Sequence, residues 1–314
     1  MKTKTLLTLS VSLLIFCSCV VSKIKNEHAK STPGCIPMNE KLLCDQSEAT
    51  NFHWLEYMYW TGRVFGEDSE EYKAVQPDTK VWRDVLCDSS YIEKYLRSPD
   101  FRNFPVVGIS QEQAEAFSKW RSDRVFEWTL IKKGILEFNP TATDTAAFTI
   151  EKYFQGNYML PYNSGDSTIM KRIAPDFSIP YPVYRLPNAA DRIVILDYID
   201  STDYIYHQKK AREYEKWRMT NLPFLLAHTP CIEDSLVEIP TRHVEPALDG
   251  RNRYKLIHNS RGNVAEWGEE PNITYGGGWP HNVEYVLSKD TISVTDQNAW
   301  TGFRNVCEWK YWGK

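Results

Sequence analysis

Two stripes of apolar side chains at helical spacing stand out in an otherwise irregular pattern. In the first, Phe52, Leu55 and Tyr59 recur directly after Thr50. A threonine in that place can accept a hydrogen bond from the first turn of a helix. The spacing therefore predicts a helix from Asn51 to about Arg63.

The second stripe follows a short β-prone run, PVVGI, at residues 105–109. Ser110 followed by Gln113 has the form of a capping box, and Ala114, Phe117 and Arg121 mark the inward side of the helix that it opens. We expect a strand, a turn and a helix in this order, with the helix continuing through residues 122–133.

Other helical signals are weaker. Asn188 can cap a third helix, with Asp191 three residues on, and Pro187 ends the extended piece before it. Residues 143–154 suggest one more helix. The 11 Trp, 18 Tyr, 15 Gly and 17 Pro indicate a loop-rich fold whose irregular segments are anchored by aromatic side chains.

The N-terminal residues have a separate chemistry. Lys2 and Lys4 precede an apolar run from Leu6 to Phe16, which is too short to span a bilayer stably and suits a cleaved signal peptide. Cys19 follows, with the small residue Ser18 before it. This arrangement resembles the lipobox of bacterial lipoproteins, whose cysteine carries a diacylglyceryl group after cleavage. An ordinary secretory signal is the alternative.

We therefore expect a lipoprotein signal peptide at residues 1–18 and a polar tether at residues 19–33. No second apolar run is long enough for a membrane span, so membrane contact would be through lipid alone. The remaining chain suffices for one large domain or two modest ones. A net charge of −4 without a basic stripe argues against nucleic acid as a partner.

Five cysteines remain besides Cys17 and Cys19. Cys35 and Cys44 flank a segment that suits a hairpin turn, so they could face each other across two short strands. A disulfide is plausible in an exported protein, and two buried thiols are the alternative. Cys87, Cys231 and Cys307 are isolated, and no cysteine or histidine cluster has the spacing of a zinc site.

Six short motifs follow one another in a fixed order. They are TNFHWLEYMYW from Thr50, PVVGISQEQAEAFSKWR from Pro105, YRLPNAAD from Tyr184, GNVAEW from Gly262, YGGGW from Tyr275 and TGFR from Thr301. In this order they resemble the formylglycine-generating-enzyme, or sulfatase-modifying-factor, family. Its usual forms are roughly TNxxY, PVVxVSWxxAxAFCxW, YRLPTEAEWE, GNVWEW, RGGSW and GFR.

The resemblance implies an α+β fold related to C-type lectin domains, with little regular secondary structure, over residues 34–314. One stretch departs from the family, because the link between Arg121 and Tyr184 is much longer than in related sequences. We place a helical insertion at about residues 124–182. The insertion either binds a partner or is a solvent-exposed addition to the fold without a function.

The resemblance also implies a structural calcium site in the segment HNSRGNVAEW. The matching ligands are the side chains of Asn259 and Glu266 and the main-chain oxygens of Gly262 and Val264. All-oxygen ligation from a tight turn suits this hard cation. The alternative is that Asn259 and Glu266 only tie the loop by hydrogen bonds.

The family's oxidase holds copper on a pair of cysteines between the last two motifs. Here the segment from Pro280 to Trp300 contains no cysteine. Copper(I) needs soft thiolate ligands, and His281 with a few carboxylates offers none. Cys307 lies beyond the segment, on the expected closing strand. We therefore expect no copper, no catalytic residues and no oxidase activity.

The branch of the family that the chain resembles most is that of the gliding-motility and type IX secretion lipoproteins of Bacteroidetes. This resemblance implies a non-catalytic structural subunit, anchored at Cys19 in the outer membrane and facing the periplasm, with other cell-envelope proteins as partners. A glycan- or small-molecule-binding lipoprotein is the alternative. Its sugar rings would stack on Trp267, Tyr275, Trp279, Trp300 and Trp309, unless these side chains form the core.

Overall fold

The computed structural model describes residues 26–83, 85, 90–139, 142–143, 146–161, 170–201, 247, 257–281 and 291–314. The expected signal peptide, Cys19, Cys87, Cys231 and residues 19–25 of the expected tether lie outside these ranges. Within them, no helix has the length and apolar character needed to cross a bilayer. Residues Ala29–Ser31 form a 3-10 turn, η1, and Thr32 is buried, so packed chain begins before Gly34.

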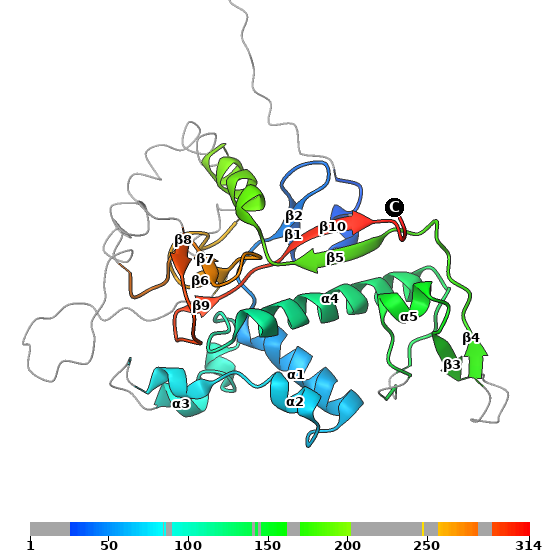
Figure 1. Ribbon diagram of the computed structural model, residues 1–314, viewed down its shortest axis with the longest axis horizontal. Helices are drawn as coiled ribbons and strands as arrows, with labels where there is room; N and C mark the ends of the chain where they lie inside the picture. The colour runs from blue at the N-terminus through cyan, green and yellow to red at the C-terminus, as the bar shows by residue number, and fades with distance from the viewer. Residues whose placement is uncertain are drawn as a thin grey trace, which may run out of the picture.

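Helices and sheets are mixed in an α+β fold, as expected (Figure 1). The first sheet is antiparallel, with the order β1 (Cys35–Pro37), β2 (Leu43–Asp45), β10 (Val306–Lys310) and β5 (Tyr181–Arg185). The long helix α4 (Gln111–Lys132) packs along this sheet. Its Ser122 Oγ accepts a bond from Tyr184 N over 2.9 Å, and its Arg121 pairs with Asp45 at 2.7 Å. Segments from both ends of the chain thus meet against one helix.

The hairpin of β1 and β2 has a register that separates Cys35 from Cys44. Cys35 pairs with Asp45, and Cys44 pairs with Ile36. Because successive side chains of a strand point to opposite faces, the two thiols lie on opposite sides of the sheet. Both cysteines are free. The predicted hairpin is confirmed, and of the two alternatives left open by the sequence the structure has separate thiols and no disulfide between Cys35 and Cys44.

Helix α1 (Asn51–Phe65) begins at the predicted residue. Thr50 forms a reciprocal cap with the third residue of the helix. The buried side includes Trp54, whereas Phe52 and Tyr59 of the predicted stripe are 50% and 73% exposed. The predicted helix is therefore confirmed. Its predicted apolar stripe lies partly in solvent, because the side of the helix that carries Trp54 packs against the core.

Helix α4 begins with the predicted capping box. Ser110 Oγ accepts from Gln113 N over 3.2 Å, and Gln113 Oε1 accepts from Ser110 N over 2.9 Å. Ala114 and Phe117 are buried, as predicted. The helix continues to Lys132, so it also supports the insertion.

Residues 105–109 do not form the predicted strand. Pro105 makes only an isolated bridge with Thr50, and Gly108 N donates to Asn298 O over 3.0 Å. Gly108 has a φ of 72°, which turns the backbone out of an extended path. The run crosses the core as an irregular segment.

The second sheet lies at the other end of α4 from α5 (Figure 1). Its order is β8 (Thr291–Ser293), β7 (Ile273–Tyr275), β6 (Ala265–Trp267) and β9 (Thr301–Gly302), with only β6 and β9 parallel. Residues 189–201 are helical, and Asn188 and Asp191 cap them reciprocally, as predicted. Short elements complete the described fold: α2 (Glu70–Ala74), η2 (Thr79–Trp82), α3 (Ser90–Lys94) and η3 (Pro99–Phe101).

The insertion is a folded unit with an apolar core of its own. It contains α5 (Ile150–Phe154), β3 (Met159–Pro161) and β4 (Met170–Arg172). The helix predicted over residues 143–154 is confined to α5. The core of the insertion is largely aromatic and includes Phe126 and Leu130 of α4 with Phe148, Tyr153, Phe154 and Tyr158. The last turns of α4 thus belong to the insertion as much as to the sheet.

Candidate functional site

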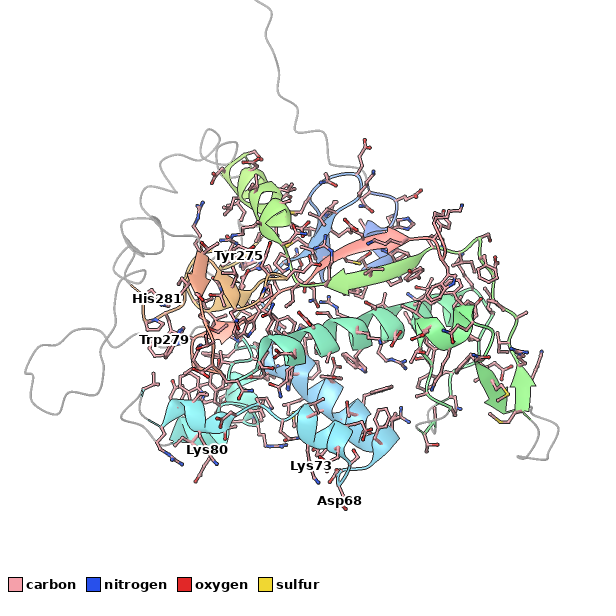
Figure 2. The ribbon with its side chains drawn as sticks, in the orientation of Figure 1. Asp68, Lys73, Lys80, Tyr275, Trp279 and His281 are labelled. Atoms are coloured by element: carbon pink, nitrogen blue, oxygen red, sulfur yellow. The ribbon has the colours of Figure 1, made fainter. Side chains whose placement is uncertain are left out.

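The last three motifs converge on the second sheet. GNVAEW leads into β6, YGGGW follows from the end of β7, and TGFR begins with β9. Figure 2 shows Tyr275, Trp279 and His281 near one another at this end of the molecule, away from Asp68 and Lys73. The motifs therefore gather around one part of the fold.

The glycines of YGGGW permit close approach of the backbone. A Cβ atom at Gly276 would lie 2.5 Å from the carbonyl oxygen of Ser260, and Gly276 has a φ of 81°. A Cβ atom at Gly278 would lie 2.6 Å from the carbonyl oxygen of Trp300. Larger residues at either position would push neighbouring segments of the site apart.

Arg304 of TGFR and Glu266 of GNVAEW form a buried ion pair. Arg304 Nε and Nη2 lie 2.7 and 2.5 Å from Glu266 Oε1. Nη2 also donates to the carbonyl of His258 over 2.7 Å. Burial alone would lower the pKa of Arg304, but the carboxylates of Glu266 and Glu48 raise it above its ordinary value. The guanidinium therefore stays charged away from water.

Glu48 brings a second carboxylate into the same interior. It is fully buried, its Oε1 accepts from Asn263 Nδ2 over 2.9 Å, and its Oε2 accepts from Asn259 Nδ2 over 3.4 Å. Burial raises the pKa of Glu48 to about 8; Arg304 acts to lower it and Glu266 to raise it. Glu48 belongs to none of the six motifs, and its only signal in the sequence is its place just ahead of the first helix cap.

The four predicted calcium ligands, Asn259, Gly262, Val264 and Glu266, lie in the segment that leads into β6. The amide nitrogen of Asn259 donates toward Glu48, which turns its oxygen the other way. Glu266 Oε2 is buried and has no hydrogen-bond partner among the described residues. An unpartnered carboxylate oxygen with an amide oxygen nearby in sequence fits a hard cation.

In the ranges that the structure describes, no group of three or more His, Cys, Asp or Glu side chains is arranged to hold a metal ion. A calcium ion at Asn259 and Glu266 would therefore depend on main-chain oxygens for most of its ligands. This set is far weaker in charge than a site built from several carboxylates.

The segment between YGGGW and TGFR is only partly described, at residues 280–281 and 291–300. His281 Nδ1 accepts a bond from Gly278 N over 2.9 Å, which ties the ring to the backbone. Trp279 Nε1 donates to Ala299 O over 2.9 Å. These bonds hold the two ends of the segment against each other, and its sequence supplies no thiolate for copper(I).

Cys307 lies in the first sheet, on β10, as expected for the closing strand. It pairs with Leu43 of β2 and Tyr184 of β5 and is fully buried. Burial raises the pKa of its thiol well above the ordinary value. A buried, protonated thiol is a poor nucleophile and a poor metal ligand.

The aromatic residues considered for sugar stacking mostly serve the core. Trp267, Tyr275 and Trp279 are 2%, 2% and 7% exposed. Trp300 is partly buried and packs in the same apolar cluster as Trp279. Trp309 stacks on a histidine ring at 4.6 Å between centroids. Their ring faces are therefore largely occupied by protein.

Comparison with known proteins gives only distant likenesses. No known protein family and no curated protein matches the chain. A solved structure titled "Crystal Structure of CarF" aligns at 14% identity and a TM-score of 0.37, over 85% of this chain and 86% of that one. The Treponema denticola variable protein 1 aligns at 14% identity and a TM-score of 0.36, over 85% and 84%. These values assign no family, and the described elements define an α+β fold.

Proposed function

We propose that the chain is a non-catalytic lipoprotein of the cell envelope, acting as a structural subunit of an outer-membrane or periplasmic assembly like those of gliding motility and type IX secretion. The order of the six motifs supports the fold family, and the apolar run before Cys19 supports a lipid anchor. The cysteine-free segment at residues 280–300 supports a subunit without oxidase chemistry.

The exposed apolar surface of the insertion carries the proposal of a partner. Nine large apolar side chains are exposed in the described chain, and five of them lie on the insertion: Trp128, Phe138, Met159, Met170 and Phe177. Exposed apolar side chains gathered on one unit are typical of interaction surfaces. The insertion also has its own core, so it can present this surface without disturbing the motif-bearing sheets.

The hairpin of β3 and β4 shows how two of these side chains cooperate. Pro161 pairs with Met170, and Met159 lies two residues before Pro161 on the same strand. Met159 and Met170 therefore share one face of the two-stranded sheet. Methionine is flexible and polarisable, which suits a surface that adapts to a partner.

Affinity purification of the full chain from detergent-solubilised membranes tests the proposal. The wild type should recover one or more envelope proteins in stoichiometric amounts, and the triple variant Met159→Ser/Met170→Ser/Phe177→Ser should lose them. Phe52→Ser removes an equally exposed ring from α1 and should retain them. Equal recovery by the triple variant would exclude the insertion as the interface. Cys19→Ser should release the chain from membranes, and its retention would exclude the anchor.

We also propose that Asn259, Gly262, Val264 and Glu266 hold a structural calcium ion. The resemblance of HNSRGNVAEW to the family's site and the buried, unpartnered Oε2 of Glu266 support this assignment. The ion would be attracted to the carboxylate of Glu266 and would favour the ionised form of Glu48, whose pKa burial raises to about 8. Its part is to stabilise the fold.

A further inference from the structure

A pocket of about 320 Å³ lies between the C-terminal half of α1 and the insertion. It is far from the GNVAEW and TGFR motifs, and no motif of the family contributes its insertion side. The residues that matter most to its chemistry are Tyr59, Trp60, Arg63, Arg124, Glu127 and Phe138. They come from two structural units, one on each side of the pocket.

Two aromatic rings in the pocket are kept in solvent. Tyr59 is 73% exposed and Phe138 is 66% exposed, the two highest values among the exposed large apolar residues of the described chain. Tyr59 belongs to α1, and Phe138 follows the end of α4. The fold brings both to one pocket without covering either, so flat apolar faces are available to a ligand.

A rigid polar pair lies beside these rings. Arg124 Nη1 is 2.5 Å from Glu127 Oε2, and the guanidinium lies over the Trp60 ring at 4.7 Å from its centroid. Arg124 Nη2 also donates to the carbonyl of Phe148. The two charged side chains are only 19% and 15% exposed, so they are held in place before any ligand arrives.

The pair lines the pocket, and one of its acceptor atoms is left without a hydrogen bond within the described chain. The bond from Arg124 uses one oxygen of Glu127, and among the described residues no hydrogen bond reaches its other oxygen, Oε1. Burial raises the pKa of Glu127, while Arg124 and Arg63 lower it. A planar carboxylate paired with a planar guanidinium presents an acceptor and donors side by side.

We propose that this pocket binds one pyranose ring of a glycan. A pyranose has an apolar C–H face, which fits the exposed rings of Tyr59 and Phe138. Its vicinal hydroxyl groups can donate to Glu127 and accept from a guanidinium at the same time. A volume of about 320 Å³ is at the small end of ligand pockets and suits one sugar unit.

The charge of the pocket favours this ligand over a strongly charged one. Arg124 and Glu127 neutralise each other at 2.5 Å, and Arg63 adds a single positive charge, so the lining carries a net charge of about one. A peptide would need more length than the pocket offers, and an aliphatic ligand would leave the buried polar pair without new partners. This glycan site shares Phe138 with the exposed apolar surface of the insertion, but none of the three side chains that the triple variant changes.

The test uses the purified full chain in a detergent that contains no sugar. Methyl pyranosides of the gluco, galacto, manno and N-acetylgluco series are titrated by calorimetry and by saturation-transfer NMR. At least one should bind saturably. Tyr59→Ala, Phe138→Ala and Glu127→Gln should each weaken that sugar's binding about tenfold, because each removes one stacking or hydrogen-bonding contact.

Trp128→Ala provides the matched control, because Trp128 is exposed on α4 and does not line the pocket. It should bind the sugar as the wild type does, and all variants should keep the wild-type melting temperature within a few degrees. The proposal is overturned if no pyranoside binds up to its solubility limit. It is also overturned if Tyr59→Ala and Phe138→Ala bind as tightly as the wild type. Loss of envelope partners by the triple variant would leave this result unchanged.

Discussion

Around Arg304 the molecule is held together by buried charge, whereas the insertion is held together by aromatic packing. The charged centre joins Glu48, Glu266 and Arg304 from three distant parts of the sequence, so its loss affects the whole domain. The insertion packs neighbouring segments of chain around Phe126 and Tyr153. Because of this difference, we expect loss of the charged centre to unfold the whole domain and loss of the aromatic core to unfold only the insertion.

Removing the charge of Arg304 should have the largest effect. Arg304→Met would leave the buried carboxylate of Glu266 without its guanidinium, which should lower the free energy of unfolding by about 3–5 kcal/mol. Urea denaturation measures this loss. Arg261→Met is the control, because Arg261 is partly exposed and lies 4.0 Å from its acidic neighbour, and it should change stability by less than about 0.5 kcal/mol. Equal effects would contradict a central role for the buried pair.

A cavity in the core of the insertion should lower the free energy of unfolding slightly less, and its effect should be confined to the insertion. Phe126 is fully buried in the core of the insertion, and Phe126→Ala should destabilise that unit by about 3 kcal/mol. Amide hydrogen exchange should accelerate in α5, β3 and β4 and stay slow in β6 and β9. Trp128→Ala, an exposed site on the same helix, should leave exchange unchanged. Faster exchange in β6 and β9 as well would show that the two regions form one cooperative unit.

Asp123 should make the stability of the insertion depend on pH. Burial raises its pKa to about 6, and its Oδ1 accepts from Ile150 N over 2.8 Å. The folded state therefore favours the neutral acid, so stability should fall as the pH rises from about 4 to about 6, by up to about 3 kcal/mol.

The isosteric variant Asp123→Asn keeps the acceptor for Ile150 and cannot ionise. The difference in the free energy of unfolding between wild type and variant should change with pH in that window only. Thermal unfolding from pH 4 to pH 8 measures it. A difference that is constant over this range would mean that Asp123 titrates as it does in the unfolded chain.

Calcium binding should have the smallest effect on the stability of the fold. A ligand that binds only the folded state stabilises it by about 1.4 kcal/mol at ten times its dissociation constant. Asn259→Gly should abolish this gain, because glycine keeps the backbone conformation at φ 52° while the amide oxygen is lost. Melting curves in chelator and in calcium show the gain. An identical midpoint in both solutions for the wild type would leave only the hydrogen-bonding interpretation of Asn259.

Local signals in the sequence predicted local structure well. The caps at Thr50, Ser110 and Asn188 were correct because a cap depends on side chains within one turn. Whether Cys35 and Cys44 form a disulfide stayed open because a slip of one residue in register reverses the face of a side chain. Sequence spacing does not determine that register.

The candidate sites depended on contacts that sequence spacing cannot show. Glu266 was identified through its motif, but Glu48 reaches the same interior from more than two hundred residues away. The pocket between α1 and the insertion was missed because Tyr59 was assigned to an apolar stripe. Its exposure is decided by which face of α1 meets the core, and that is a property of packing.

The most direct test of the account is hydrogen exchange of the full chain, free and in the complex with envelope proteins that we propose. If the insertion is the interface, amides in β3, β4 and the segment around Phe177 should become protected in the complex. Amides of the motif-bearing strands β6 and β9 should exchange as they do in the free chain. Protection confined to residues 275–300, with none on the insertion, would contradict the account and place the interface on the aromatic segments there.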